Sequence, residues 1–93
     1  MQTHEFVLHA RIEVEELHKW LSAGWLIPRS ADEQPDYTDL DLARAHLIRD
    51  LYDLGVNDEG IPIILDLLDQ IHGLRRALRE ALATVEAQSR DRR

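Results

Sequence analysis

Ninety-three residues with a hydrophobic content of 44% can form one small domain with a compact core. The absence of cysteine excludes disulfides, zinc-thiolate sites and cysteine nucleophiles. A net charge of −7 disfavours binding to nucleic acid or anionic lipid and favours a basic partner. No apolar run approaches the roughly 18 residues that span a bilayer, and the first residues do not resemble a signal peptide, so we expect a soluble, cytoplasmic protein.

The first 24 residues predict two short helices joined by a tight turn. Residues 3–10 are expected to form a helix capped by Thr3, with an edge strand as the alternative, and Arg11-Ile12 forms the turn. The second helix, residues 13–23, ends at Gly24. Its apolar face consists of Val14, Leu17, Trp20 and Leu21. Such a pair of helices is what a helix-turn-helix requires.

Residues 25–38 predict a small β-hairpin. Trp25-Leu26-Ile27 is the expected first strand, ended by Pro28, and Tyr37-Thr38 is the expected second strand. The polar residues between them form the turn, with Asp32-Glu33 at the tip. We expect Trp25, like Trp20, to lie in or near the core.

A third helix is expected from Leu40 to Leu54, capped by Asp39 and ended by Gly55. Its expected core-facing stripe is Leu40, Ala43, Leu47, Leu51 and Leu54. Asn57 would cap the last helix. Pro62 lies just inside that helix, so either its first turn is irregular or the regular helix begins nearer Gly60.

The last helix carries a heptad pattern, typical of a coiled coil. Its a and d positions are Ile61, Ile64, Leu68, Ile71, Arg75, Leu78, Leu82 and Val85, of which only the arginine is not aliphatic. No second long helix is predicted in this chain, so self-association through the seven aliphatic residues is the simplest interpretation. We therefore predict an acidic helix-turn-helix part at residues 1–57 and a dimerisation helix at residues 58–93, within one mainly α structural domain.

The residue types that carry catalysis form no convincing site. The five histidines do not cluster at the spacing of metal ligands, and the further ligands that would complete a site are missing. These histidines are His4, His9, His18, His46 and His72. The four glycines are scattered and form no phosphate-binding loop. We predict no metal, no cofactor and no enzymatic activity.

Acidic residues dominate the N-terminal part. The first 60 residues contain 13 Asp or Glu against five Lys or Arg, a local net charge of −8, whereas proteins that bind DNA gain affinity by neutralising phosphates. Candidate partner-binding residues lie where the last two helices meet and where the second helix begins: Asp50, Asp53, Asp58, Glu59, Glu13 and Glu16. The alternative is that these carboxylates only keep a small domain soluble.

Several segments, in this order, resemble the chaperone-modulator family CbpM, a MerR-like offshoot: Thr3-His4-Glu5-Phe6, Leu8-His9, Glu15-Glu16-Leu17, Gly24-Trp25-Leu26-Ile27-Pro28, Ile48-Arg49-Asp50-Leu51 with Leu54, Gly60-Ile61, and Leu65 with Leu68-Asp69 and Ile71. The resemblance covers nearly the whole chain, from Thr3 to Leu82. It implies a mainly α, MerR-like winged helix-turn-helix with a small β-hairpin wing, followed by a long C-terminal coiled-coil helix.

The same resemblance implies a small homodimer that binds the J-domain of the DnaJ-like co-chaperone CbpA and inhibits its co-chaperone and DNA-binding activities. The J-domain's second helix is basic in that family's partner, which suits the acidic N-terminal part. The alternative is a minimal MerR-like, DNA-binding transcriptional regulator. In that case the residues that would meet DNA are Arg11, Lys19, Arg29, Arg44 and Arg49.

Overall fold

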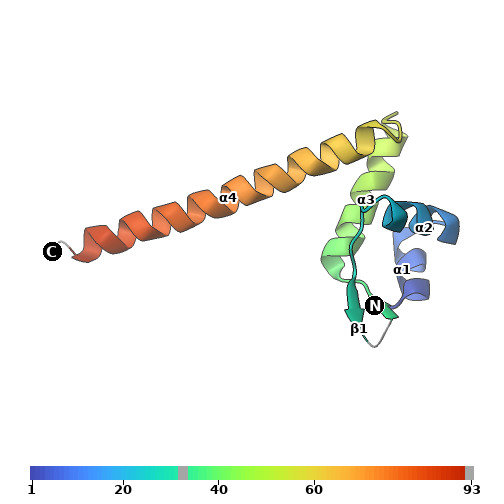
Figure 1. Ribbon diagram of the computed structural model, residues 1–93, viewed down its shortest axis with the longest axis horizontal. Helices are drawn as coiled ribbons and strands as arrows, with labels where there is room; N and C mark the ends of the chain where they lie inside the picture. Colours follow the sequence, from blue (N-terminus) through green and yellow to red (C-terminus); the bar gives the residue numbers. More distant parts are fainter. Residues whose placement is uncertain (32–33, 92–93) are drawn as a thin grey trace. The chain divides into compact units, whose positions relative to one another are not determined.

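The computed structural model describes residues 1–31 and 34–91, which form a mainly α structure with one small hairpin (Figure 1). In chain order its elements are α1 (Thr3–Ala10), α2 (Val14–Ser22), β1 (Arg29–Ala31), β2 (Gln34–Asp36), α3 (Asp39–Asp53) and α4 (Gly60–Asp91). The chain divides into two compact units. We call residues 1–61 the head and the helix from Pro62 onward the stalk. The predicted fold class, with its long C-terminal helix, is confirmed.

The first three helices end by the same local arrangement. A residue in the left-handed region follows or closes each of them: Arg11 with φ 57°, Gly24 with φ 78° and Gly55 with φ 95°. The next amide then donates to the carbonyl five residues earlier, in the pairs Ile12–Val7 at 3.3 Å, Trp25–Trp20 at 2.9 Å and Val56–Leu51 at 2.9 Å. This is the bond that closes a Schellman motif and turns the chain off the helix axis. Both glycines are stops predicted from the sequence.

Two predicted helix caps are wrong by one residue. Asp39 is not the cap of α3 but its first residue. The cap is Thr38, whose hydroxyl accepts from the Asp41 amide at 3.2 Å while the Asp41 carboxylate accepts from the Thr38 amide at 2.9 Å. This reciprocal pair satisfies two donors that the helix itself leaves unpaired. Thr3 is likewise the first residue of α1 rather than its cap.

Asn57 binds the first residue of α4 as predicted for a cap, although it lies three positions before that residue rather than directly before it. Its side-chain oxygen accepts from the Gly60 amide at 2.8 Å, in the manner of an N-cap. The helix begins at Gly60, so Pro62 falls in its first turn, where proline is tolerated. Of the two alternatives raised by Pro62, the structure has the later helix start.

The hairpin lies within the predicted residues 25–38, but its first strand comes later and its second strand earlier than predicted. β1 and β2 pair antiparallel, with Arg29 opposite Asp36 and Ser30 opposite Pro35. Trp25-Leu26-Ile27 is therefore not a strand: Trp25 and Leu26 are buried loop residues, because an apolar run can fill a core without pairing with another strand. Tyr37-Thr38 is not a strand either. Asp32-Glu33, the predicted tip, lies outside the described residues.

The core of the head draws side chains from each of its helices and from the loops between them. The largest fully buried members are Trp20, Phe6, Leu17, Leu26, Ile48 and Ile61. The ring of Phe6 stacks on that of Tyr37, with centroids 4.2 Å apart, and such pairs add about 0.5–1.5 kcal/mol to the burial itself. The prediction that Trp20 and Trp25 lie in the core is confirmed, at exposures of 1% and 7%.

Helix α3 buries a different face from the predicted one. Ala45 and Ile48 are fully buried, whereas Leu40 and Leu54, at the two ends of the predicted stripe, are 76% and 80% exposed. The prediction was wrong because this helix has apolar residues on two faces. Periodicity finds both faces but does not say which one the rest of the head will cover.

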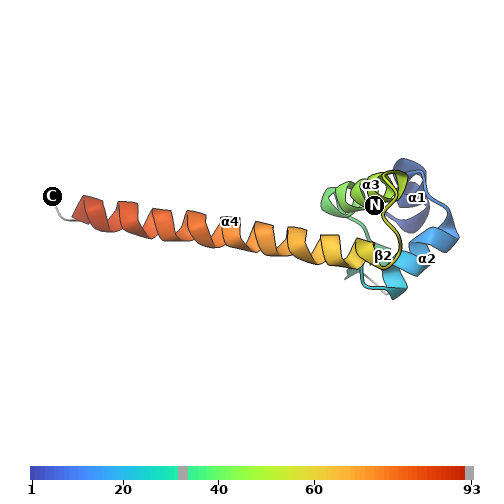
Figure 2. The ribbon, with the colours of Figure 1, turned by 90° about the horizontal axis from the view of Figure 1, so that it is seen from above.

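The stalk belongs to one continuous helix of 32 residues (Figures 1 and 2). Its exposed aliphatic side chains are Ile63, Leu67, Ile71, Leu74, Leu78, Leu82 and Val85. Ile64 and Leu68 are half-buried. Ile61, predicted as the first a position of the dimer interface, is instead fully buried, so it is not accessible to a second chain. We call the remaining aliphatic a and d positions of the stalk the seam. Within the described ranges, no helix is both long enough and apolar enough to cross a membrane.

Replacing Trp20 tests the core. We expect Trp20→Ala to lower the free energy of unfolding by about 3–5 kcal/mol, because it leaves a large cavity. Leu8→Ala is the matched control, since Leu8 is 73% exposed, and it should change stability by no more than about 0.5 kcal/mol. Urea unfolding followed by circular dichroism measures both. Equal effects of the two changes would contradict the assigned core.

Candidate functional site

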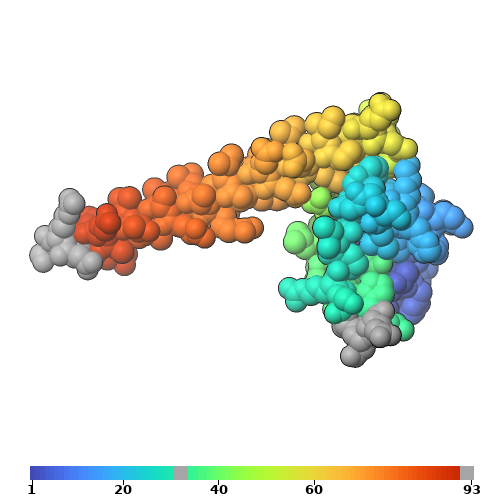
Figure 3. Space-filling model, in the orientation of Figure 1, coloured from blue at the N-terminus to red at the C-terminus, as the bar shows by residue number. Residues whose placement is uncertain are grey.

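Helices α1 and α2 form the helix-turn-helix of the head. Figure 3 shows their blue surfaces side by side. The second helix of such a motif is the one that enters the major groove in proteins that read DNA. Here α2 opens on three exposed carboxylates, Glu13 at its N-cap and Glu15 and Glu16 in its first turn. These charges suit the helix N-terminus and repel phosphate.

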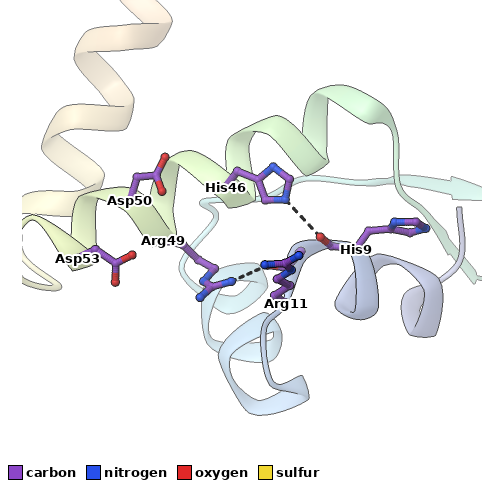
Figure 4. A pocket seen from close by; sticks show the side chains of 7 residues that line it. His9, Arg11, His46, Arg49, Asp50 and Asp53 are labelled. Atoms are coloured by element: carbon purple, nitrogen blue, oxygen red, sulfur yellow. Dashed lines mark hydrogen bonds between the residues drawn. The ribbon is translucent and has the colours of Figure 1, made fainter.

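An open pocket lies where the end of α1 meets α3 (Figure 4). It is lined by His9, Ala10, Arg11, His46, Arg49, Asp50 and Asp53. Arg49 Nη1 donates to the Ala10 carbonyl at 3.1 Å, and His46 Nε2 lies 3.3 Å from the His9 carbonyl. Because a carbonyl only accepts, the proton of this second bond is on His46 Nε2. Two side chains of α3 thereby satisfy the last carbonyls of α1, which lack partners within the helix.

A second pocket adjoins the first. Its lining residues are Arg11, Glu16, Lys19, Trp20, Arg49, Tyr52 and Asp53, of which Arg11, Arg49 and Asp53 also line the first pocket. The two pockets together therefore follow α3 from His46 to Asp53. Their walls carry both signs of charge, so this surface is acidic only at Asp50, Asp53 and Glu16.

Lys19 and Tyr52 both bind Asp58, in the loop before α4. Lys19 Nζ lies 2.7 Å from one carboxylate oxygen, and the Tyr52 hydroxyl donates to the other. The ammonium of Lys19 also lies 5.7 Å from the centroid of the Tyr52 ring, within the range of a cation–π interaction. Asp58 thus ties α2 to the loop that follows α3.

The comparisons with known proteins agree with this architecture. A family model described as "MerR HTH family regulatory protein" matches residues 1–81. The chain belongs to this MerR family. The family is a regulatory one rather than a family of enzymes. No curated protein and no solved structure matches the chain significantly.

Three of the five cations that would serve a DNA-binding MerR protein are used inside this head. Arg44 Nε donates to the Trp25 carbonyl, Arg49 donates to the Ala10 carbonyl, and Lys19 pairs with Asp58. Arg11, in the turn of the helix-turn-helix, and Arg29, in β1, are exposed. The cations of this MerR-family head therefore largely hold its own elements together.

The structure brings only some of the predicted partner-binding residues together. Asp50 and Asp53 are exposed and line the same pocket, and Glu16 lies in the adjoining one. Glu13 and Glu59 are exposed but line neither. Asp58 is exposed but already bound by Lys19 and Tyr52. Sequence analysis missed this contact because Lys19 and Asp58 are 39 positions apart and share no local pattern.

The structure gives no sign of a metal centre in residues 1–31 and 34–91, where no group of three or more His, Cys, Asp or Glu could hold an ion. His9 and His46 do lie close, but they meet through a ring nitrogen and a backbone carbonyl rather than through two ring nitrogens. This contact gives the His46 side chain a role in joining two helices, whereas His9 takes part only through its backbone carbonyl.

The contacts of Asp58 shift three pKa values. The hydrogen bond from Lys19, followed by the one from Tyr52, lowers the pKa of the Asp58 carboxyl. The hydrogen bond to Asp58 raises the pKa of Lys19, and burial, then the bond to Asp58, raises the pKa of Tyr52. The stabilisation from Asp58 is therefore present above its unfolded pKa of about 3.9 and is lost as pH falls through the folded value. That from Lys19 is present below about 10.4 and is lost as pH rises through its folded value.

Removing the ammonium tests this linkage. In Lys19→Met we expect the pKa of Asp58 to rise toward its ordinary value, because the largest cause of its depression is gone. Carbon-detected NMR titration of the Asp58 carboxyl measures it. Lys19→Arg, which keeps the positive charge, should leave the pKa depressed. An unchanged Asp58 pKa in Lys19→Met would contradict the assigned ion pair.

Proposed function

We propose that this MerR-family protein is a chaperone modulator, which binds the J-domain of a DnaJ/CbpA-type co-chaperone and inhibits its co-chaperone and DNA-binding activities. The observation that carries the proposal is the acidic opening of α2, where Glu13, Glu15 and Glu16 are all exposed. Carboxylates at this position repel the phosphates that a DNA-reading helix would approach. A helix that meets a basic protein surface is served by carboxylates.

The use of the cations supports a protein partner over DNA. Affinity for DNA comes largely from the counterions that Lys and Arg displace from phosphates. In the first 60 residues only five such side chains stand against 13 carboxylates, and Lys19, Arg44 and Arg49 are bound to acceptors within the head. Little positive surface remains with which to neutralise phosphates.

The resemblance to the CbpM family supplies the identity of the partner. The second helix of the J-domain is basic in that family's partner, and the exposed carboxylates of the head are complementary to it. Charges at the rim of an interface mainly set the association rate and its dependence on salt. Binding should therefore weaken as ionic strength rises and the Debye length falls, to about 3 Å at 1 M.

We further propose that the protein is a homodimer through the stalk. The aliphatic a and d positions accessible to a second chain are Ile64, Leu68, Ile71, Leu78, Leu82 and Val85. Full burial of each such side chain contributes about 1.5–3 kcal/mol. Association that removes this row from water is therefore strongly favourable, and a second copy of the chain carries the same row.

Leu78→Asp tests the dimer. The change places a charge in the middle of the seam, so light scattering should report a monomer or a strongly weakened dimer. The control is Ala77→Asp, which adds the same charge one position away from the seam and should leave the dimer intact. A Leu78→Asp variant that stays dimeric and fully folded would contradict dimerisation through the a and d positions of the stalk.

Reversing the charge of Asp50 and Asp53 tests the acidic surface. We expect Asp50→Lys/Asp53→Lys to bind an isolated J-domain of a DnaJ-type co-chaperone about tenfold more weakly, by calorimetry at physiological salt. The control Glu5→Lys/Glu80→Lys makes the same change of net charge at exposed positions outside both pockets. Asp58 is left intact in both variants because it pairs with Lys19. Equal binding by the two variants would rule out Asp50 and Asp53 as partner contacts.

The second candidate is a minimal MerR-like transcriptional regulator, which the description of the matching family favours. Under the leading proposal, fluorescence anisotropy should detect no sequence-specific DNA binding at physiological salt. Tight, salt-sensitive binding of the wild-type protein to one DNA site, without affinity for the J-domain, would establish the regulator instead.

A further inference from the structure

The outward face of α3 carries a row of aliphatic side chains. Leu40, Ala43, Leu47, Leu51 and Leu54 follow one another at steps of three or four residues. At 3.6 residues per turn these positions fall within an arc of roughly 80°. The arc is centred well away from Ala45 and Ile48, the two residues through which α3 enters the core.

This row remains accessible to a partner. Leu40 and Leu54 are 76% and 80% exposed, and Ala43 is exposed between them. Leu47 and Leu51 are half-buried. A single exposed leucine on a small domain needs no explanation, but a contiguous row along one helix is typical of an interaction surface.

Exposed carboxylates border the row along one edge only, since Asp41 on the other side of the helix is half-buried and bound by Thr38. Asp50, Asp39 and Asp53 lie on this edge at increasing angles from the row, and all three are exposed. On the opposite edge stands Arg44, whose guanidinium donates to the Trp25 carbonyl. The face is therefore apolar in the middle and acidic on one side.

We infer that this face of α3 docks an amphipathic helix of a protein partner, one that carries aliphatic side chains beside a row of Lys or Arg. Interfaces combine an apolar centre with a charged rim, and a helix laid along another helix makes its contacts through i, i+3, i+4 and i+7 anchors. The aliphatic row supplies the centre, and the three carboxylates select a basic edge in the partner. The inference rests on the proposed function. It adds the apolar part of the interface to the charged contacts proposed above.

A nucleic acid does not fit this face, because phosphates gain nothing from an aliphatic row and are repelled by its acidic edge. The stalk of a second copy fits less well than a basic helix. Its exposed aliphatic residues are accompanied by Asp66, Asp69, Glu80 and Glu86 as well as by arginines, so part of its length would meet the acidic edge with like charge.

The test compares two double variants in calorimetry with an isolated J-domain of a DnaJ-type co-chaperone. Leu40→Lys/Ala43→Lys places two cations on the outward face of α3. Leu8→Lys/Ala23→Lys is matched in residue types, charge and exposure, but lies on α1 and at the end of α2. We expect the α3 variant to bind about tenfold or more weakly than wild type, and the control to stay within about threefold.

A neutral variant separates apolar contact from charge repulsion. Leu40→Ala/Leu54→Ala adds no charge and changes only exposed positions. We expect it to weaken binding several-fold at every ionic strength, because the lost contacts are not screened by salt. The wild-type association rate, by contrast, should fall with salt through the carboxylates.

The outcomes distinguish this inference from the function on which it rests. If the wild type binds the J-domain and the α3 variants bind equally well, the inference is wrong and the proposed function stands. If the wild type does not bind a J-domain, the proposed function fails and the inference fails with it. If wild-type dimers become monomers on Leu40→Ala/Leu54→Ala, a second copy covers this face and the inference is again wrong.

Discussion

The burial of a small apolar core constrains every other feature of the head. Sixty-one residues offer few large side chains, and each helix contributes at least one of them, from Phe6 in α1 to Ile48 in α3. The rotation of α3 follows from this demand. Once Ala45 and Ile48 point inward, Leu40 and Leu54 must point outward. The composition of the core therefore also decides which surface of the helix a partner meets.

Several charged or polar side chains of the head also stabilise its internal structure. Arg49 and His46 complete the hydrogen bonding at the end of α1, and Arg44 holds the loop that carries Trp25. This MerR-family head thus uses three of its five cations, Lys19, Arg44 and Arg49, for contacts between its own elements, while Arg11 and Arg29 stay exposed. This use of the cations supports the proposal of a protein partner over DNA.

Local chemistry made most of the fold predictable. Helix boundaries depend mainly on neighbouring residues: Gly24 and Gly55 end their helices as predicted, and Asn57 accepts from the first amide of α4. The errors arose where distant residues decide. The position of the hairpin, the inward face of α3 and the pairing of Asp58 with Lys19 each depend on what the rest of the head covers or approaches. The partner-binding residues stay a prediction, and what the sequence did not predict there is the pairing of Asp58, because the pairing of carboxylates is a long-range property.

The repeated helix ends also bear on how the chain folds. Each of these helix ends is closed by a backbone hydrogen bond between residues only five positions apart, so little conformational entropy is lost in closing it. Proteins dominated by such local contacts fold in microseconds to milliseconds. The stacking of Phe6 on Tyr37 is different, since it joins α1 to the residue after the hairpin. Such distant contacts, which also include Arg49 with Ala10 and Lys19 with Asp58, close long loops and should therefore form more slowly than the helices.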